Sequence, residues 1–132
     1  MSRPIRIALI EDNPADVHWF RITLEDTPYD CDLQVFTGGL AAVQELQERP
    51  AADLLVVDWY LPMLEGRDLL DALGAIEHLR GKPMAVFAPA RELGQFKTGW
   101  AGGQIHLLTK PVNPQMIGDI LRNIELTDSQ KV

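Results

Sequence analysis

The sequence has very little of what marks a secreted or membrane protein. Its 132 residues include one cysteine, Cys31, so no disulfide can form within the chain. No apolar run reaches the roughly 18 residues that a membrane-spanning helix needs. No long apolar stretch follows the early basic residue Arg3, so a secretory leader is not indicated. We therefore expect a cytoplasmic protein that does not span a membrane.

Positive charge is also scarce. The chain has 12 Lys and Arg residues against 19 Asp and Glu residues, which gives a formal net charge of -7. Because no run of basic residues offsets this charge, direct contact with nucleic acid is disfavoured. A chain of 132 residues that is 46% hydrophobic can bury one ordinary core. We expect a single domain over 1–132, with a core at about 4–126 and a short C-terminal tail.

Short apolar runs alternate with amphipathic segments along the chain. This pattern is typical of an α/β protein, in which a parallel sheet is covered by helices on both faces. Five strands are expected, at 5–10, 33–36, 54–58, 83–88 and 105–108. Helices are expected at 14–26, 38–48, 68–77 and 114–126. The segment 91–103 is rich in glycine and should form only a short or irregular helix, because each helical glycine costs roughly 1 kcal/mol relative to alanine.

Three acids and one lysine follow the apolar runs of three expected strands. Glu11 and Asp12 follow the first strand, Asp58 ends the third, and Lys110 follows the fifth. Ligands of open α/β sheets bind at the carboxyl ends of the strands, so these side chains should meet in one crevice. Three adjacent carboxylates repel one another and raise each other's pKa values, which a divalent cation would relieve. Oxygen ligands without a nearby Cys or His favour Mg²⁺.

Three motifs in this chain resemble those of the receiver domains of two-component response regulators, the CheY-like family. They are Glu11-Asp12-Asn13-Pro14, then Asp58-Trp59-Tyr60-Leu61-Pro62 with Gly66 further on, and Lys110-Pro111. The resemblance covers essentially the whole chain. It implies a flavodoxin-like (βα)5 fold, in which these motifs stand at the ends of the first, third and fifth strands.

The resemblance also implies a role for each site residue. Asp58 would accept a phosphoryl group from a histidine kinase, a phosphotransfer protein or a small phosphodonor, forming an aspartyl phosphate. Asp12 and Asp58 would bind Mg²⁺ directly, Glu11 mainly through a water, and Tyr60 through its backbone carbonyl. Lys110 would pair with a phosphoryl oxygen, and the peptide bond that follows it would be cis. The protein would not be an enzyme beyond assisting its own phosphotransfer and dephosphorylation.

The chain departs from the family pattern at its switch positions. The family ends its fourth strand with Ser or Thr and then a small residue, whose hydroxyl and backbone N–H donate to the phosphoryl group. Ala88 and Pro89 stand there and supply neither donor. Leu107 takes the place of the family's switch aromatic. We therefore expect weak or rerouted transmission of phosphorylation to the surface of the fourth helix, fifth strand and fifth helix.

Three classes of function stay open. The first is a stand-alone receiver in a phosphorelay, which signals by contact with a downstream protein and could form a homodimer. The second is an interaction module that works without phosphorylation, favoured by the altered switch positions. The third is a Mg²⁺-dependent phosphohydrolase, which is disfavoured because the chain has no spare length for a substrate-binding cap. His18, His78 and His106 share no spacing, and Cys31 has no CxxC partner, so no metal site or reactive thiol is expected at these residues.

Overall fold

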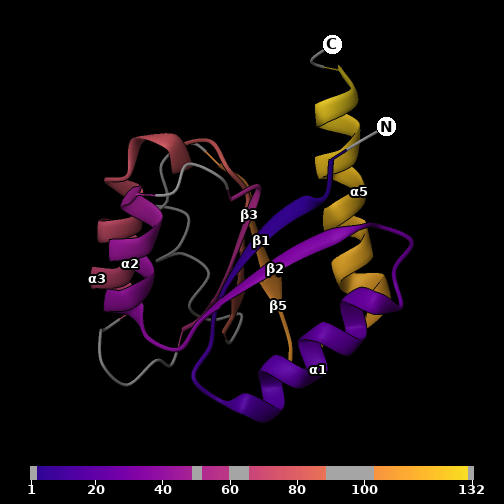
Figure 1. Ribbon diagram of the computed structural model, residues 1–132, viewed down its shortest axis with the longest axis horizontal. Coiled ribbons are helices and arrows are strands. Elements are labelled where there is room, and N and C mark those ends of the chain that lie inside the picture. The colour runs from indigo at the N-terminus through magenta and orange to yellow at the C-terminus, as the bar shows by residue number, and fades with distance from the viewer. Residues whose placement is uncertain (1–2, 49–51, 60–65, 89–102, 131–132) are drawn as a thin grey trace.

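The computed structural model describes residues 3–48, 52–59, 66–88 and 103–130. Five strands in these segments form one parallel sheet with the order β2-β1-β3-β4-β5 (Figure 1). This confirms the expected five-stranded parallel sheet. The strands are β1 (Ile5–Ile10), β2 (Cys31–Phe36), β3 (Leu54–Asp58), β4 (Met84–Phe87) and β5 (Ile105–Leu108).

Helices cover both faces of the sheet, which confirms the flavodoxin-like architecture (Figure 1). On one face α1 (Pro14–Glu25) packs against α5 (Pro114–Gln130), and on the other α2 (Gly39–Glu48) packs against α3 (Gly66–Gly74). A short 3₁₀ helix, η1 (Glu77–Leu79), follows α3. Among the described helices, none combines the length and the apolar character needed to cross a membrane.

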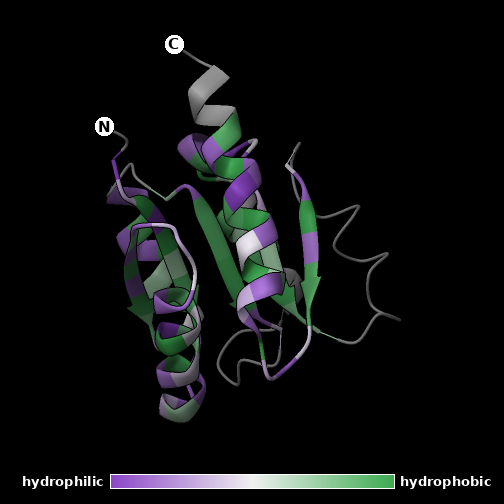
Figure 2. Cartoon of the chain, turned by 90° about the vertical axis from the view of Figure 1, so that its right-hand side faces the viewer, coloured by the Kyte–Doolittle hydropathy of each residue, from purple (hydrophilic) through white to green (hydrophobic). Residues whose placement is uncertain are grey.

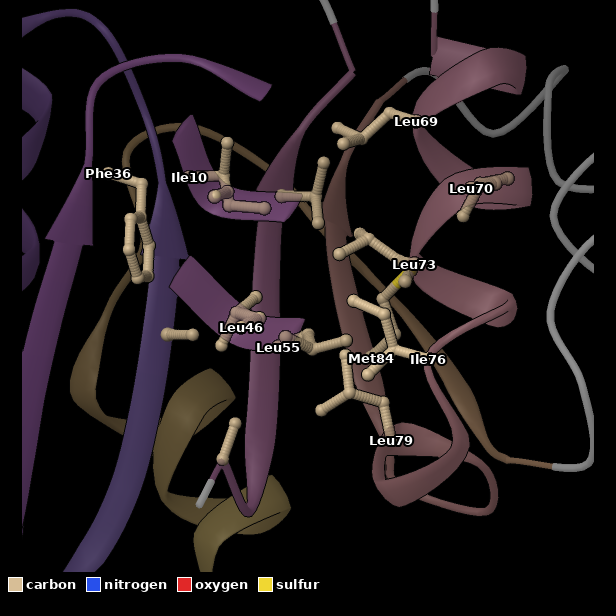
Figure 3. Close-up of a cluster of buried hydrophobic side chains, with 14 of the residues drawn as sticks. Ile10, Phe36, Leu46, Leu55, Leu69, Leu70, Leu73, Ile76, Leu79 and Met84 are labelled. Atoms are coloured by element: carbon tan, nitrogen blue, oxygen red, sulfur yellow. The ribbon is translucent and has the colours of Figure 1, made fainter. Parts of the chain in front are cut away.

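The strands divide their side chains between two buried clusters, because successive residues of a strand point to opposite faces. In β1, for example, Ala8 and Ile10 face α2 and α3. This cluster, which we call the α2/α3-side core, is shown in Figure 3. Its largest members, apart from Ile10, are Phe36, Leu46, Leu55, Leu69, Leu70, Leu73, Ile76, Leu79 and Met84.

The second cluster, the α1/α5-side core, takes the alternate residues of the same strands, such as Ile7 and Leu9. Helices α1 and α5 contribute Phe20, Leu24, Ile117, Ile120 and Leu121. In Figure 2 the central strands are green along much of their length, whereas α1 and α5 carry purple residues on their outer surfaces. Burying one such apolar side chain stabilises a fold by about 1.5–3 kcal/mol. Because helices cover both faces of the sheet, successive residues of a central strand are apolar.

The third helix and the fourth strand have different bounds from those predicted from the sequence. The third helix is at Gly66–Gly74 rather than 68–77. Beyond Gly74 the chain is no longer α-helical, and Ile76 is extended, with φ -80° and ψ 113°. This change of direction brings Ile76 into the α2/α3-side core. The fourth strand spans Met84–Phe87 rather than 83–88, and Pro83 has no N–H to donate to the strand ladder.

The second strand and the last helix are both longer than predicted. β2 begins at Cys31, two residues before 33, because its pairing with β1 starts at Ile5. An exposed acid, Asp32, lies within this extension and masks the strand pattern in the sequence. The last helix continues to Gln130 instead of ending at 126, since residues 127–130 contain no glycine or proline to end it. An irregular segment was expected at 91–103, but residues 91–102 lie outside the described part of the chain.

Candidate functional site

The carboxyl edge of the sheet carries three acids from two adjacent strands. Glu11 and Asp12 directly follow β1, and Asp58 is the last residue of β3, which pairs with β1. Carboxylate oxygens of the three residues lie within 4.8 Å of one another. Glu11 is 1% exposed and Asp58 is 7% exposed, whereas Asp12 is open to solvent. The sequence therefore predicted a cluster of acids that the fold does bring together, with two of the three largely removed from water.

A compact turn between β1 and α1 fixes the position of Glu11. Asn13 caps the helix, and its Oδ1 accepts a hydrogen bond from the N–H of Ala15 at 2.9 Å. Pro14 occupies the first helical position, where a backbone N–H would have no partner within the helix, so its absence there costs no hydrogen bond. The N–H of Glu11 donates to the carbonyl of Phe36 at 2.9 Å, and the N–H of Asn13 donates to Glu11 Oε2 at 3.4 Å. The turn thus holds the Glu11 carboxylate at the edge of the sheet.

Lys110 reaches the acids from the segment that follows β5. Its Nζ lies 2.8 Å from Oε1 of Glu11, 3.3 Å from Oδ2 of Asp58 and 2.7 Å from Oδ2 of Asp16. The peptide bond that follows Lys110 is cis, as expected. The amine also lies 5.5 Å from the centroid of the Phe87 ring. One ammonium group therefore contacts two buried acids and one partly exposed acid.

Burial and mutual contacts shift the pKa values of this cluster in opposite directions. Burial is the main cause that raises the pKa of Glu11 to about 7; the hydrogen bond from Lys110 opposes the rise, and Asp58 adds to it. Burial alone would lower the pKa of Lys110, but hydrogen bonds to Asp16 and Glu11 outweigh it and raise the pKa above its ordinary value. Lys110 therefore stays charged at neutral pH, while negative charge at Glu11 is disfavoured by its surroundings.

Asp16 is the site residue that the sequence analysis did not single out. It lies in the first turn of α1, four residues after Asp12, and is 35% exposed at its side chain. Residues three or four apart lie on the same side of a helix, so the Asn13 cap gave a usable signal that Asp16 would lie near the crevice. Its contact with Lys110, in contrast, depends on a segment 94 residues away and has no local signature.

The three expected switch positions are only partly within the described residues. Ala88 and Leu107 are partly buried and pack against the α2/α3-side core. Pro89 lies outside the described residues, and so does Tyr60, whose backbone carbonyl was an expected metal ligand. The described residues thus place an apolar side chain at both 88 and 107, on the sheet face opposite the α1/α5-side core.

His78, His106 and Cys31 are not members of the acidic cluster, and neither is His18, although His18 lines the same hollow as Glu11 and Asp12. Nε2 of His78 lies 2.6 Å from the carbonyl oxygen of Leu46, and burial lowers the pKa of His106. Among the described residues, the carboxylates of the acidic cluster form a candidate metal-binding group that includes no histidine or cysteine. Cys31 is a free, half-buried thiol at the start of β2, and burial is the main cause that raises its pKa to about 11.

Comparison with known proteins places the chain among signalling proteins. A family model described as the response regulator receiver domain matches residues 7–122. The sensor protein GacS of Pseudomonas syringae pv. syringae is 27% identical over 123 residues, which cover 91% of this chain and 13% of GacS. The response regulator Rcp1 of Synechocystis sp. is 30% identical over 89 residues, which cover 63% of this chain and 60% of Rcp1. The chain therefore matches only part of the length of these curated relatives.

Solved structures show the same fold. The chemotaxis response regulator CheY4 of Vibrio cholerae is similar with a TM-score of 0.75 and 18% identity, over 92% of this chain and 99% of that chain. The receiver domain of the sensor histidine kinase PA1611 of Pseudomonas aeruginosa is similar with a TM-score of 0.74 and 21% identity, over 92% of this chain and 97% of that one. Together with the family match over 7–122, the strand order and the acids at the ends of β1 and β3 identify this chain as a member of the response regulator receiver domain family, the phosphoacceptor modules of two-component signalling.

Proposed function

We propose that this receiver accepts a phosphoryl group on Asp58. The observation that carries the proposal is the setting of that side chain: it ends β3, lies within 4.8 Å of the Glu11 and Asp12 carboxylate oxygens, and has the Lys110 ammonium 3.3 Å away. A carboxylate is a competent nucleophile toward phosphorus when nearby positive charge neutralises the phosphoryl oxygens.

The donor set fits Mg²⁺ as the cofactor. Glu11, Asp12 and Asp58 offer oxygen ligands alone, and hard oxygen ligands with one or two carboxylates are what Mg²⁺ prefers. Burial, and to a lesser extent Asp58, raises the pKa of Glu11, and a divalent cation beside it would favour its charged form. When bound, Mg²⁺ would supply charge that neutralises the phosphoryl oxygens. The PA1611 receiver domain holds a magnesium ion in its active-site cleft, which agrees with this assignment.

In the proposed reaction the phosphoryl group moves from a histidine nitrogen of the donor to a carboxylate oxygen of Asp58. An Oδ atom of Asp58 forms a bond to phosphorus while the P–N bond of a phosphohistidine breaks, and the electron pair of that bond stays on the imidazole nitrogen. Lys110 donates a hydrogen bond to an oxygen of the phosphoryl group and stabilises its charge. Asp12 is exposed to solvent at this site, whereas Glu11 and Asp58 are buried.

The donor would be a histidine kinase or a phosphotransfer protein, and the receiver would act as a stand-alone response regulator through contact with a downstream protein. Rcp1, which is named a response regulator and is 30% identical over 89 residues, is consistent with the role of a response regulator. GacS, named a sensor protein, shows that receivers of similar sequence also occur within sensors. No role in binding nucleic acid or a membrane is proposed.

A second function is favoured by positions 88 and 107. Alanine at 88 has no hydroxyl to donate to a phosphoryl oxygen, and a hydrogen bond to a charged group contributes roughly 1.5–3 kcal/mol. Leu107 already packs against the α2/α3-side core and has no aromatic ring to move. The receiver would then bind its downstream protein with little dependence on phosphorylation.

Intact mass spectrometry tests the leading proposal. The protein is incubated with acetyl phosphate and Mg²⁺, beside an Asp58→Asn variant, a metal-free sample and an Asp32→Asn variant that removes an exposed acid on β2. We expect one phosphoryl adduct in the parent protein and in Asp32→Asn, and none in Asp58→Asn or without metal. Absence of the adduct in the parent protein, also with a cognate kinase, would favour the phosphorylation-independent module.

A further inference from the structure

The Lys110 ammonium donates hydrogen bonds to three carboxylates. An ammonium group carries three N–H bonds, and three carboxylates lie around it. The shortest contact, 2.7 Å, is to Asp16, and the longest, 3.3 Å, is to Asp58. A phosphoryl oxygen on Asp58 can therefore gain a hydrogen bond from Lys110 only if an existing acceptor gives one up.

Asp16 is different in kind from the other two acceptors. Glu11 and Asp58 belong to the group of carboxylates that can share a metal ion, and a bound cation would satisfy their negative charge. Asp16 is not in that group and lies on α1, at the rim of the crevice. Its interaction with Lys110 would therefore persist when the metal-binding acids are occupied, and it draws the ammonium away from Asp58.

Side chains of α1 contact the backbone of the segment that carries Lys110. Nε1 of Trp19, one turn along α1, donates a hydrogen bond to the carbonyl of Val112 at 2.6 Å. Oγ1 of Thr23 lies 3.5 Å from the same carbonyl. The space left between α1 and the segment around Lys110 is about 10 Å³, roughly enough for one water. The short Asp16 contact is thus part of a packed junction between α1 and the lysine segment.

We propose that Asp16 is a positioning residue that holds the Lys110 ammonium toward α1 and competes with the phosphoryl group on Asp58 for it. This inference rests on the proposed phosphorylation of Asp58. The pair stabilises the unphosphorylated protein, and its strength sets how readily Lys110 serves the incoming phosphoryl oxygens. Removing the Asp16 carboxylate should therefore speed phosphorylation, whereas the loss of a merely structural contact would slow it or leave it unchanged.

The test is the initial rate of adduct formation with acetyl phosphate and Mg²⁺, followed by intact mass. In this step the bond between Asp58 oxygen and phosphorus forms, the bond between phosphorus and the acetyl oxygen breaks, and acetate leaves with the electron pair. We expect Asp16→Asn to raise the rate about two- to fivefold, the size that corresponds to a partly exposed ion pair. Asp16→Glu keeps the charge and should return the rate toward that of the parent protein.

Glu25→Gln is the matched control, because it removes one negative charge from an exposed site in the last turn of the same helix. An equal gain in Glu25→Gln would assign the effect to general charge and overturn the inference. An unchanged or slower rate in Asp16→Asn, with a normal adduct on Asp58, would overturn it as well. If the parent protein itself forms no adduct, the proposed function fails first and the inference falls with it.

A second readout needs no phosphorylation. Urea unfolding of the parent protein, Asp16→Asn, Lys110→Gln and the double variant forms a cycle that measures the coupling of the two side chains without metal or donor. We expect the two single changes to be non-additive, with a stabilising interaction between Asp16 and Lys110. Additive effects would show that the pair does not form in solution, which contradicts the inference whatever the rates are.

Discussion

The Arg3 guanidinium donates to both carboxylate oxygens of Asp53, from Nη1 at 2.6 Å and from Nη2 at 2.7 Å. The N–H of Arg6 donates to the same carboxylate at 2.8 Å. This arrangement joins the residues before β3 to β1 at the edge of the sheet opposite the acidic cluster. Burial alone would raise the pKa of Asp53, but the hydrogen bonds from Arg3 and Arg6 outweigh it and hold the pKa below its usual value.

The Arg3–Asp53 ion pair predicts how the free energy of unfolding depends on pH. Because the folded pKa of Asp53 is below its unfolded value, its stabilisation is present above the ordinary aspartate range and is lost as pH falls through the lowered folded pKa. We expect Arg3→Gln to lower the free energy of unfolding by about 1 kcal/mol at neutral pH and to reduce its fall in acid. Urea unfolding across the acid range measures both effects. Arg122→Gln, which removes an exposed cation on α5, should change neither.

Magnesium should stabilise the fold through the acidic cluster. A ligand that binds only the folded state at ten times its dissociation constant adds about 1.4 kcal/mol to the free energy of unfolding. We expect the melting temperature to rise with Mg²⁺ and the rise to vanish in Asp12→Asn, which loses an exposed carboxylate of the cluster. Asp71→Asn, an exposed acid on α3, should keep the full response. The same rise in Asp12→Asn would place the metal elsewhere.

Restoring a hydroxyl at position 88 should strengthen the response to phosphorylation. Thr at this position could donate to a phosphoryl oxygen, and such a bond would shift the conformational equilibrium by about tenfold or more. Trp59, which is partly buried next to the acceptor, serves as the reporter, with Trp59→Phe to identify its share of the fluorescence. We expect a larger phosphorylation-dependent change in Ala88→Thr than in the parent protein. Ala88→Val has nearly the same shape without the hydroxyl, and an equal change in it would assign the effect to packing.

Cys31 should be a slow nucleophile. Burial, followed by the nearby Asp30 and Glu125 charges, raises the pKa of its thiol to about 11, so little thiolate exists near neutral pH. We expect alkylation by iodoacetamide at pH 8 to be at least about tenfold slower than in urea-unfolded protein, and to accelerate with rising pH. Mass spectrometry follows the reaction. Equal rates in the folded and unfolded protein would show that the thiol is not protected as the structure indicates.

The sequence predicted the features that depend on local pattern or on a strand end. Residues 7–10 of β1 and 54–57 of β3 are buried on both faces, so these apolar runs are easy to recognise, and Glu11 and Asp58 directly follow them. Asp16 was missed because its partner is chosen by packing between α1 and a distant segment. The end of α3 was misplaced because the prediction continued the helix past Gly74, whereas Ile76 is extended and buried in the α2/α3-side core.

The sheet separates the charged groups of the site from the side chains at positions 88 and 107. Glu11 and Lys110 border the same small hollow as Leu9, Phe20 and Phe87 of the α1/α5-side core. Ala88 and Leu107 pack on the other side, with the residues beneath α2 and α3. Substitutions at these two positions therefore repack one side of the sheet and leave the charged groups of the other in place. A receiver built in this way can change how it responds while it keeps the groups that would carry out its chemistry.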